Sequence, residues 1–348
     1  MRRIGSALAA TFVVLIVTAG PMAACGGLIG PNGAVNLLRT TTLAAYHDGV
    51  EHYVTAFQFA GGGGKFGSIT PLPGIPSSVE KGGDWTLQRL VRETSPVDLT
   101  LREAASPAAS GAEELMKVRI DALDITVLRG GAADIGAWSK AHGFRLPPDA
   151  PEVLDFYASR SPIFLAAAFD GAAAAARGQQ IGDGTPVHIT IPTAEPWVPL
   201  RILALGKTGA ERIQAEVYLL GDVRPNLLPA PLGRNGLTLS HSAPASTSLL
   251  DDLRSDRGMS WVPTSGWLSQ VSIDAAASDL RFDLAINAAG TAVPSRVDAG
   301  LQLPGAPAAD RPTPVDVARL VIAVLAVLAG ILVVAGLSGG RRPTSAAA

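Results

Sequence analysis

The sequence predicts an α+β fold: a mostly antiparallel β-sheet with a few short helices, followed near the C-terminus by one transmembrane helix. Three observations lead to this prediction. Runs of alternating apolar and polar residues recur between residues 37 and 220, as in strands with one buried face. Two or three short helical patterns lie between these runs. An unbroken apolar run occupies residues 320–337.

The elements are expected in the following order. Asp48-Gly49 favours a type I′ hairpin within 37–59, which would set His47 opposite Val50 and His52 opposite Ala45. The proline-rich segment 69–76 is expected at a sheet edge, because proline lacks the amide donor. Helices are then expected at 85–93, 132–142 and 151–159, and strands at 116–128, 163–169, 187–191, 197–205 and 213–220.

The apolar run at 320–337 is long enough to cross a bilayer. At about 1.5 Å per residue, a helix of this run and the three residues after it reaches roughly 30 Å, the thickness of the hydrocarbon core. Two arginines follow it, as on the cytoplasmic flank of a spanning helix. We therefore predict a transmembrane helix at 316–340 and a cytoplasmic tail at 341–348. The protein would be a single-pass type I protein of the cell membrane, with the bulk of the chain extracytoplasmic.

The first 24 residues have the features of a secretory signal peptide, with basic residues before an apolar stretch at 7–17. Cleavage after Ala24 would leave Cys25, the single cysteine, as the first mature residue. The stretch from Met22 to Cys25 resembles a bacterial lipobox, in which this cysteine is acylated. The alternative is an ordinary cleavage that leaves a free thiol. Since one cysteine cannot form an internal disulfide, packing must stabilise the fold.

Composition divides the exported part into three segments. Residues 25–222 carry the strand and helix patterns and form the expected α+β domain. Pro, Ser and Asn increase in 223–292, which we expect to be a looser extension of that domain. Residues 293–315 are rich in Pro and Ala without apolar periodicity and are expected to form a stalk.

Charge argues against nucleic acid as a partner. The chain has 28 Lys and Arg against 30 Asp and Glu, and several of the arginines belong to the two ends, so the exported part is acidic. Binding of nucleic acid or of anionic envelope polymers depends on basic clusters. The partners expected are the membrane, through the C-terminal helix, and another envelope protein.

A glycine motif, Gly62-x-Gly64-x-x-Gly67, matches the dinucleotide fingerprint by letter. That fingerprint must open a helix whose N-terminus faces the pyrophosphate, whereas Pro71 and Pro73 follow here. We therefore expect no nucleotide and no other cofactor.

Ser78-x-x-Lys81 with a later Lys207-Thr208-Gly209 matches two signatures of penicillin-binding proteins and serine β-lactamases. In that chemistry the lysine activates the serine, and both must lie on the first turn of a buried helix. Gly82-Gly83 directly after Lys81 argue against such a helix. Ser78 and Lys81 are kept as an alternative catalytic pair, although no complete catalytic motif is present.

His47 and His52 are the candidate metal ligands. In the expected hairpin they are diagonal neighbours on one face, roughly 7–8 Å apart at the backbone. No third ligand is evident nearby in the sequence, so the alternative is a pair of solvated residues at a hairpin tip.

Short segments spread over about residues 25–222 form a recognisable series: Cys25-Gly26-Gly27, Asp48-Gly49, Pro71-Leu72-Pro73, Trp138, Gly143-Phe144-Arg145-Leu146-Pro147, Tyr157, Pro186-Val187-His188-Ile189-Thr190-Ile191, Pro199-Leu200-Arg201 and Val217-Tyr218-Leu219. In this order they resemble a known family, the bacterial secreted or membrane-tethered proteins with domain of unknown function 2330. Two departures are Ser68-Ile69, where a Trp often precedes the Pro-x-Pro, and the lack of a second early cysteine, which removes any family disulfide. The resemblance implies location and fold and supplies no catalytic residue.

The function expected from these observations is that of a membrane-anchored extracytoplasmic domain of the bacterial envelope that binds a ligand or a partner. The first alternative is an envelope-acting serine hydrolase or acyl transferase that uses Ser78 and Lys81. The second is a structural envelope component without a ligand.

Overall fold

The computed structural model describes residues 27–30, 33–34, 40–58, 65–94, 114–176, 184–233 and 235–305. The chain divides into two compact units, Met1–Pro304 and Gly305–Ala348, and the fold described here belongs to the first. The expected signal peptide, Cys25, the transmembrane segment and the tail lie outside the described residues. Within the described ranges, no helix is both long enough and apolar enough to span a membrane.

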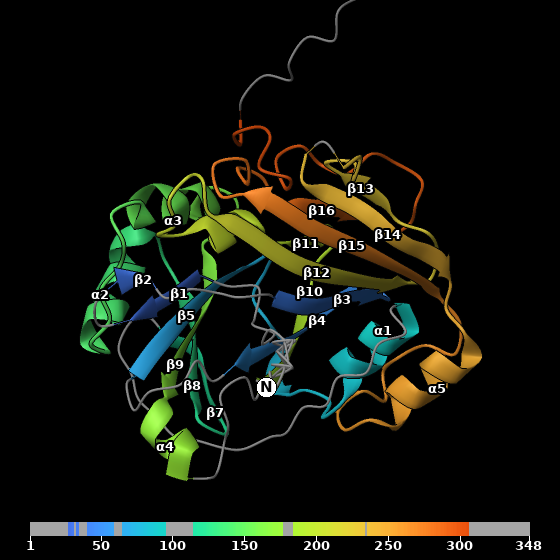
Figure 1. The fold of residues 1–348 in the computed structure, drawn as a ribbon, viewed down its shortest axis with the longest axis horizontal. Coiled ribbons are helices and arrows are strands. Elements are labelled where there is room, and N and C mark those ends of the chain that lie inside the picture. Colours follow the sequence, from blue (N-terminus) through green and yellow to red (C-terminus); the bar gives the residue numbers. More distant parts are fainter. Residues whose placement is uncertain are drawn as a thin grey trace, which may run out of the picture. The chain divides into compact units, whose positions relative to one another are not determined.

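Two β-sheets packed face to face form the centre of the unit, and helices cover their outer faces (Figure 1). The helices α2 (Ala132–Ala141) and α3 (Ala150–Ala158) cover one sheet. The helices α1 (Thr86–Thr94) and α5 (Thr247–Ser255) cover the other. The order of layers is therefore helix, sheet, sheet, helix, and mostly antiparallel sheets with few helices agree with the predicted α+β class.

Sheet A is a seven-stranded sheet, and all its neighbours are antiparallel except β12 and β3, which are parallel. Its strands, in spatial order, are β14 (Leu237–Pro244), β15 (Trp267–Ala276), β12 (Arg212–Gly221), β3 (Thr40–His47), β4 (Val50–Gln58), β10 (Gly184–Pro192) and β6 (Ser78–Lys81).

Sheet B has six strands and is antiparallel throughout. Its order is β2 (Gly33–Ala34), β1 (Gly27–Gly30), β5 (Lys65–Leu72), β9 (Ile163–Asp170), β8 (Leu123–Arg129) and β7 (Glu114–Ile120). The small sheet C consists of β11 (Trp197–Val198), β16 (Leu284–Asn287) and β13 (Asn226–Leu228). Two further short helices in the described residues are α4 (Gly171–Ala176) and the 3₁₀ helix η1 (Arg201–Ala204).

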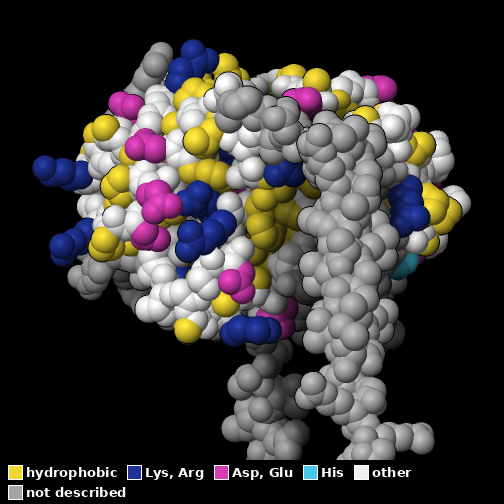
Figure 2. Space-filling model, turned by 90° about the horizontal axis from the view of Figure 1, so that it is seen from above, with side chains coloured by type: hydrophobic (Ala, Val, Ile, Leu, Met, Phe, Trp, Pro, Cys, Tyr) yellow, Lys and Arg dark blue, Asp and Glu magenta, His cyan; other side chains and the backbone are white. Residues whose placement is uncertain are grey.

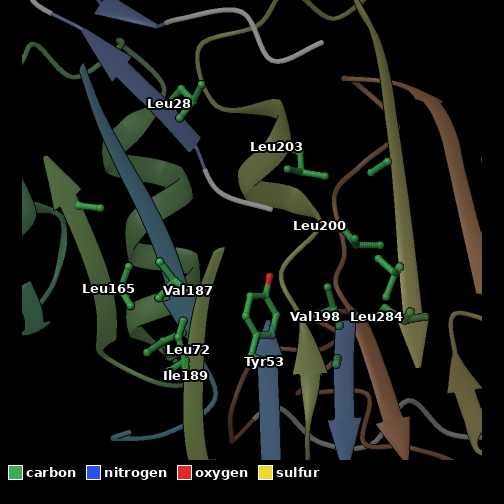
Figure 3. Packing of buried hydrophobic residues seen from close by; sticks show 14 of the residues in the cluster. Leu28, Tyr53, Leu72, Leu165, Val187, Ile189, Val198, Leu200, Leu203 and Leu284 are labelled. Atoms are coloured by element: carbon green, nitrogen blue, oxygen red, sulfur yellow. The ribbon is translucent and has the colours of Figure 1, made fainter. Parts of the chain in front are cut away.

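Alternation along the strands sorts the apolar side chains into layers. On β9, Leu165 enters the core between the sheets, while its neighbour Phe164 packs with α2 and α3. Figure 3 shows the inner core, where Tyr53 of β4 and Ile189 of β10 lie near Leu72 of β5. Period-two alternation therefore accounts for both faces of each sheet.

The N-terminus of α1 is capped from a distance. The main-chain N–H groups of Asp84 and Trp85 donate to the carboxylate of Asp256, at 2.9 and 3.0 Å. The Thr86 hydroxyl donates to the same carboxylate at 2.7 Å. Asp256 follows α5, so it ties the two helices over sheet A together.

The predicted looser extension at 223–292 is wrong for its described residues. Strand β15 pairs with β12 along its whole length and contributes Val271 and Ile273 to the main core. The polar side chains that weaken its pattern have partners: Gln270 and Ser272 donate to the buried Glu216 carboxylate, at 2.8 and 2.7 Å. The segment is an integral part of the domain, although its composition resembles a loop.

The expected stalk at 293–315 is also wrong in its first part. Arg160 donates from its guanidinium to the carbonyl oxygens of Val297 and Asp298. Ala299 is buried, and its carbonyl oxygen accepts from the main-chain N–H of Asp283 at 3.0 Å. Residues up to 304 therefore belong to the folded unit, and 306–315 lie outside the described residues.

Three element boundaries differ from the predictions. The run 116–128 is two strands joined by a turn at Asp121, whose φ is 56°. The run 197–205 contains only β11 before η1 begins. The segment 69–76, expected at a sheet edge, begins as the second half of β5, inside sheet B. The described pairing of β5 with β1 stops at Ile69, so Pro71 interrupts no ladder on that side.

Candidate functional site

Ser78 and Lys81 lie on the edge strand β6 and not on a helix. Residues three apart on a strand point to opposite faces, so the two side chains do not meet. The Ser78 hydroxyl donates to the Thr190 hydroxyl at 3.1 Å, whereas Lys81 Nζ forms an ion pair with Asp121 at 2.8 Å. This geometry lacks the contact by which the lysine would activate the serine.

The Lys207-Thr208-Gly209 motif forms a turn between η1 and β12. The Thr208 N–H and hydroxyl both donate to Glu211, at 2.7 and 2.9 Å. The hydrogen bonds of Thr208 are thus made within the loop itself. The loop leads into β12, which is not a neighbour of β6 in sheet A.

The Asp48-Gly49 hairpin is formed as the sequence predicts. Asp48 and Gly49 have φ values of 49° and 79°, and the register sets His47 opposite Val50 and His52 opposite Ala45. His47 lies 2.7 Å from an Asp222 carboxylate oxygen.

His52 takes a different partner, His188 of the neighbouring strand β10. Nδ1 of His52 lies 2.9 Å from Nε2 of His188, and the Trp261 indole stacks on the His52 ring at 3.7 Å between centroids. In the described part of the chain, no three His, Cys, Asp or Glu side chains are grouped so that they could hold a metal ion. The two candidate metal ligands, His47 and His52, therefore lie in separate pairs. The sequence analysis did not predict His188 and Trp261 as neighbours of His52.

Glu51 is a buried acid that the sequence analysis did not single out. It lies on β4, opposite Tyr46 and on the same inner face as Tyr53. Its side chain is 0% exposed, and neither carboxyl oxygen has a hydrogen-bond partner among the described residues. Its position two residues before Tyr53 was the available signal, because period-two alternation places both on one face.

Burial raises the pKa of Glu51 to about 8, and the nearby Trp197 main-chain amide offsets only part of this rise. The carboxyl group is consequently protonated at neutral pH. Burying a polar group without a hydrogen bond is unfavourable, and such groups concentrate at functional sites. Glu51 is therefore the centre of the candidate site.

A small pocket lies at the seam between sheets A and C; Glu51 is one of its lining residues, while both oxygens of the Glu51 carboxyl group are shielded from solvent. Its volume is about 10 Å³, and apart from Glu51 and Tyr46 its lining is apolar or glycine. The walls come from β3, β4, β12 and β16 and from the loop that carries Val223 and Pro225. Because Val223 is 46% exposed, the pocket lies close to the surface. The phenol of Tyr46 donates outward to the Thr193 carbonyl oxygen at 2.9 Å.

A second, larger hollow of about 210 Å³ lies between α3, η1 and the end of β15. Its charged groups are paired with protein groups. Arg201 forms an ion pair with Glu152, and both Asp149 carboxylate oxygens accept from the Gly206 N–H. On the face shown in Figure 2, acidic and basic side chains are interspersed. The charged groups of this hollow therefore already have protein partners, which makes it a weaker candidate for a binding site than the Glu51 pocket.

Comparisons with known proteins identify relatives of this chain. The family described as "Uncharacterized protein conserved in bacteria (DUF2330)" matches residues 19–227, which confirms the resemblance seen in the sequence. The crystal structure of baculovirus P35 is 10% identical, covers 71% of this chain and 96% of its own, and has a TM-score of 0.37. The chain matched in the caspase-8/P35 complex is 6% identical, with coverages of 71% and 95% and a TM-score of 0.39. Likenesses at this level carry no argument about fold or function. No curated protein matches the chain.

Proposed function

The chain belongs to the family of uncharacterized proteins conserved in bacteria (DUF2330), and from this premise we propose that it is an extracytoplasmic binding domain held at the cell membrane by its C-terminal apolar segment. The observation that carries the binding function is Glu51, a fully buried carboxyl group whose oxygens have no regular hydrogen-bond partner apart from the nearby Trp197 main-chain amide, beside an apolar pocket. Small-molecule sites combine apolar walls with a few polar groups, as this lining does, but they are larger, so a ligand would have to widen the pocket of about 10 Å³.

The location rests on the two ends of the chain. A basic and apolar N-terminus precedes the domain, and the apolar run at 320–337, followed by two arginines, comes after it. Acylation of Cys25 would add a second anchor. If protease is added to intact spheroplasts, we expect it to digest the folded domain and leave a short membrane-protected C-terminal fragment. Full protection until the membrane is lysed would refute the location.

The alternative of a serine hydrolase has less support. Ser78 and Lys81 point to opposite faces of an edge strand, and each is bound to a different partner. We expect no covalent adduct with a fluorescent penicillin. An adduct that disappears in Ser78→Ala would favour the hydrolase over the binding domain.

The binding function is tested by a ligand screen with the full-length chain in detergent. Small amines, carboxylic acids, sugars and amino acids are compared by thermal shift on the wild type and on Glu51→Gln, which keeps the shape of the side chain. One class should raise the Tm of the wild type and leave that of the variant unchanged. If no class distinguishes the two proteins, the pocket is not a ligand site, and the structural alternative gains support.

A further inference from the structure

We propose that the hollow between α3, η1 and the end of β15 is a second binding site, which takes a small aliphatic monocarboxylate. Lys207 and Arg281 hold the carboxylate of this ligand, and the apolar part of the lining receives its aliphatic chain. The hollow shares no lining residue with the Glu51 pocket, so this site goes beyond the binding function proposed above and does not depend on it.

The hollow is large enough to admit a small molecule. Its volume of about 210 Å³ is space for roughly ten or more water-sized groups, at about 10–15 Å³ each. It opens to solvent, and the exposed side chains of Glu152 and Arg281 lie in its lining. A monocarboxylate with a chain of a few carbon atoms can therefore enter without a rearrangement of the fold.

Two cations of the lining keep unused hydrogen-bond donors, although each has a protein partner. The side chain of Lys207 is 7% exposed, and its ion pair with Glu211 spans 3.8 Å, which is beyond hydrogen-bonding distance. Arg281 donates from Nε to the Ser278 carbonyl oxygen at 2.9 Å, and its two terminal nitrogen atoms have no acceptor among the described residues. A nearly buried ammonium group without a hydrogen bond is unfavourable, so an anion that accepts from Lys207 and Arg281 would stabilise both.

The balance of charge selects a monoanion. The lining has three basic and two acidic residues. The acids do not compete for the unused donors, because Glu152 pairs with Arg201 and the Asp149 carboxylate accepts from the Gly206 N–H. The excess of one positive charge is partly offset by Glu211, which lies outside the lining. A doubly charged phosphate would therefore face nearby carboxylates without compensation, whereas a single carboxylate matches the site.

The two loops that carry the cations are held together through the main chain. The N–H groups of Ala277 and Ser278 donate to the carbonyl oxygens of Glu211 and Gly209, at 2.9 and 3.1 Å. These loops come directly before β12 and directly after β15, which are paired along their whole length. The backbone at both cations is thus fixed before a ligand arrives, which lowers the entropic cost of binding.

The apolar residues of the lining favour an aliphatic chain behind the carboxylate. Val153 of α3, Ala204 of η1 and the pair Ala277 and Leu280 after β15 form this part of the wall. Methylene groups that lie against it are removed from water, which is favourable at about 25 cal/mol for each Å². A sugar or a sulfate ion would gain nothing from these residues.

The test is isothermal titration of the full-length chain in detergent with sodium pentanoate, with detergent alone as the blank. We expect saturable binding to the wild type and about tenfold weaker binding in Lys207→Gln and in Arg281→Gln, because each change removes one charged hydrogen-bond donor group. Lys140→Gln is the matched control: it removes one positive charge from the exposed surface of α2 and should bind pentanoate as the wild type does.

Pentan-1-ol and inorganic phosphate are the competing probes. Equal binding of pentan-1-ol would show that the apolar wall acts alone, and tighter binding of phosphate would show that the site selects another anion; either result would overturn the assignment. Lack of pentanoate binding to the wild type, or unchanged binding in both cation variants, would do the same.

Glu51→Gln separates this site from the Glu51 pocket. If pentanoate binding were lost in Glu51→Gln and kept in both cation variants, the ligand would belong to the Glu51 pocket; the present assignment would fall, and the proposed binding function would gain support. The Tm of each variant, measured without ligand, identifies a loss of binding caused by misfolding. Because Arg281 is exposed, Arg281→Gln still tests the site if Lys207→Gln does not fold.

Discussion

His52 and His188, on the adjacent strands β4 and β10, are joined by a hydrogen bond of 2.9 Å between Nδ1 of the first and Nε2 of the second. One ring must donate its proton and the other must accept it, so the two rings cannot both be protonated in this arrangement. Trp261 stacks on His52 at an interplanar angle of 5° and limits its access to solvent. Burial is the main cause that lowers the pKa of each histidine to about 4. The pair thus couples the stability of the fold to pH.

The first prediction concerns the loss of stability at acidic pH. Because the folded-state pKa values lie below the unfolded value of 6.5, the unfolded state binds protons first as the pH falls. The contribution of this pair to the free energy of unfolding should be largest above pH 6.5 and should fall between pH 6.5 and about 4. After a discount for the partial exposure of His52, the loss is on the order of 2–4 kcal/mol.

Urea denaturation at half-unit steps of pH measures this loss. The double variant His52→Gln/His188→Gln should have a flatter profile between pH 4 and 6.5. His241→Gln changes a histidine outside the pair and serves as the control. An unchanged slope in the double variant would contradict the coupling.

The second prediction concerns Glu51 and has the opposite sign. Its folded-state pKa, about 8, lies above the unfolded value of 4.5, so its contribution to stability is complete below pH 4.5 and is lost as the pH rises through 8. Relative to the wild type, Glu51→Gln should be similar near pH 4.5 and more stable at pH 9, by on the order of 4 kcal/mol. Denaturation curves at these two pH values measure the difference. A difference that is the same at both pH values would show that the carboxyl does not titrate as described.

The third prediction concerns the hairpin tip. Gly49 has a φ of 79°, and a Cβ added there would meet nothing within 4 Å, so Gly49→Ala tests backbone strain without a clash. It should lower the free energy of unfolding by about 1 kcal/mol. Asp48→Gly is the matched change at the preceding residue and should be neutral or slightly stabilising, since Asp48 also has a positive φ. Equal effects of the two changes would argue against a type I′ turn.

The hairpin could be predicted because its determinants are local. Two residues, Asp48 and Gly49, fix the turn, and the turn fixes the register that pairs His47 with Val50. The helices at 86–94 and 132–141 were predictable for a similar reason, because short-range sequence patterns indicate them. In contrast, the parallel neighbours β3 and β12 are some 170 residues apart in the chain, and no local signal encodes that pairing.

The site was less predictable than the fold. His52 could be assigned to a hairpin face, but its partner His188 is 136 residues away, on a strand whose neighbour the sequence does not specify. The burial of Glu51 follows from alternation with Tyr53, yet the second wall of its pocket comes from Ile286 on another sheet. Similarly, the outer face of β15 has polar residues that read as loop composition, because their partner Glu216 lies on a different strand.

A buried ion pair closes the C-terminal part of the domain. Asp283 is 0% exposed and accepts hydrogen bonds from the Tyr157 hydroxyl at 2.8 Å and from the Leu200 N–H at 2.8 Å. Its second oxygen pairs with the guanidinium of Arg160, which is also buried. Arg160 in turn donates to the Asp298 carbonyl oxygen. One charged pair therefore joins α3, the loop before η1 and the segment that follows sheet C.

The fourth prediction follows from this arrangement. Asp283→Ala leaves the Arg160 charge buried without a counter-ion, so it should lower the free energy of unfolding by about 3–5 kcal/mol. Asp279→Ala, at an exposed carboxylate four residues earlier, should change it by less than about 0.5 kcal/mol. The double variant Asp283→Ala/Arg160→Met should be less destabilised than the sum of the single changes, because no unpaired charge remains. Limited proteolysis should then cut residues 293–304 in Asp283→Ala before the rest of the domain unfolds. If cleavage there occurs at the same rate as in the wild type, Arg160 does not hold this segment, and the segment is attached by its apolar contacts, such as that of the buried Ala299.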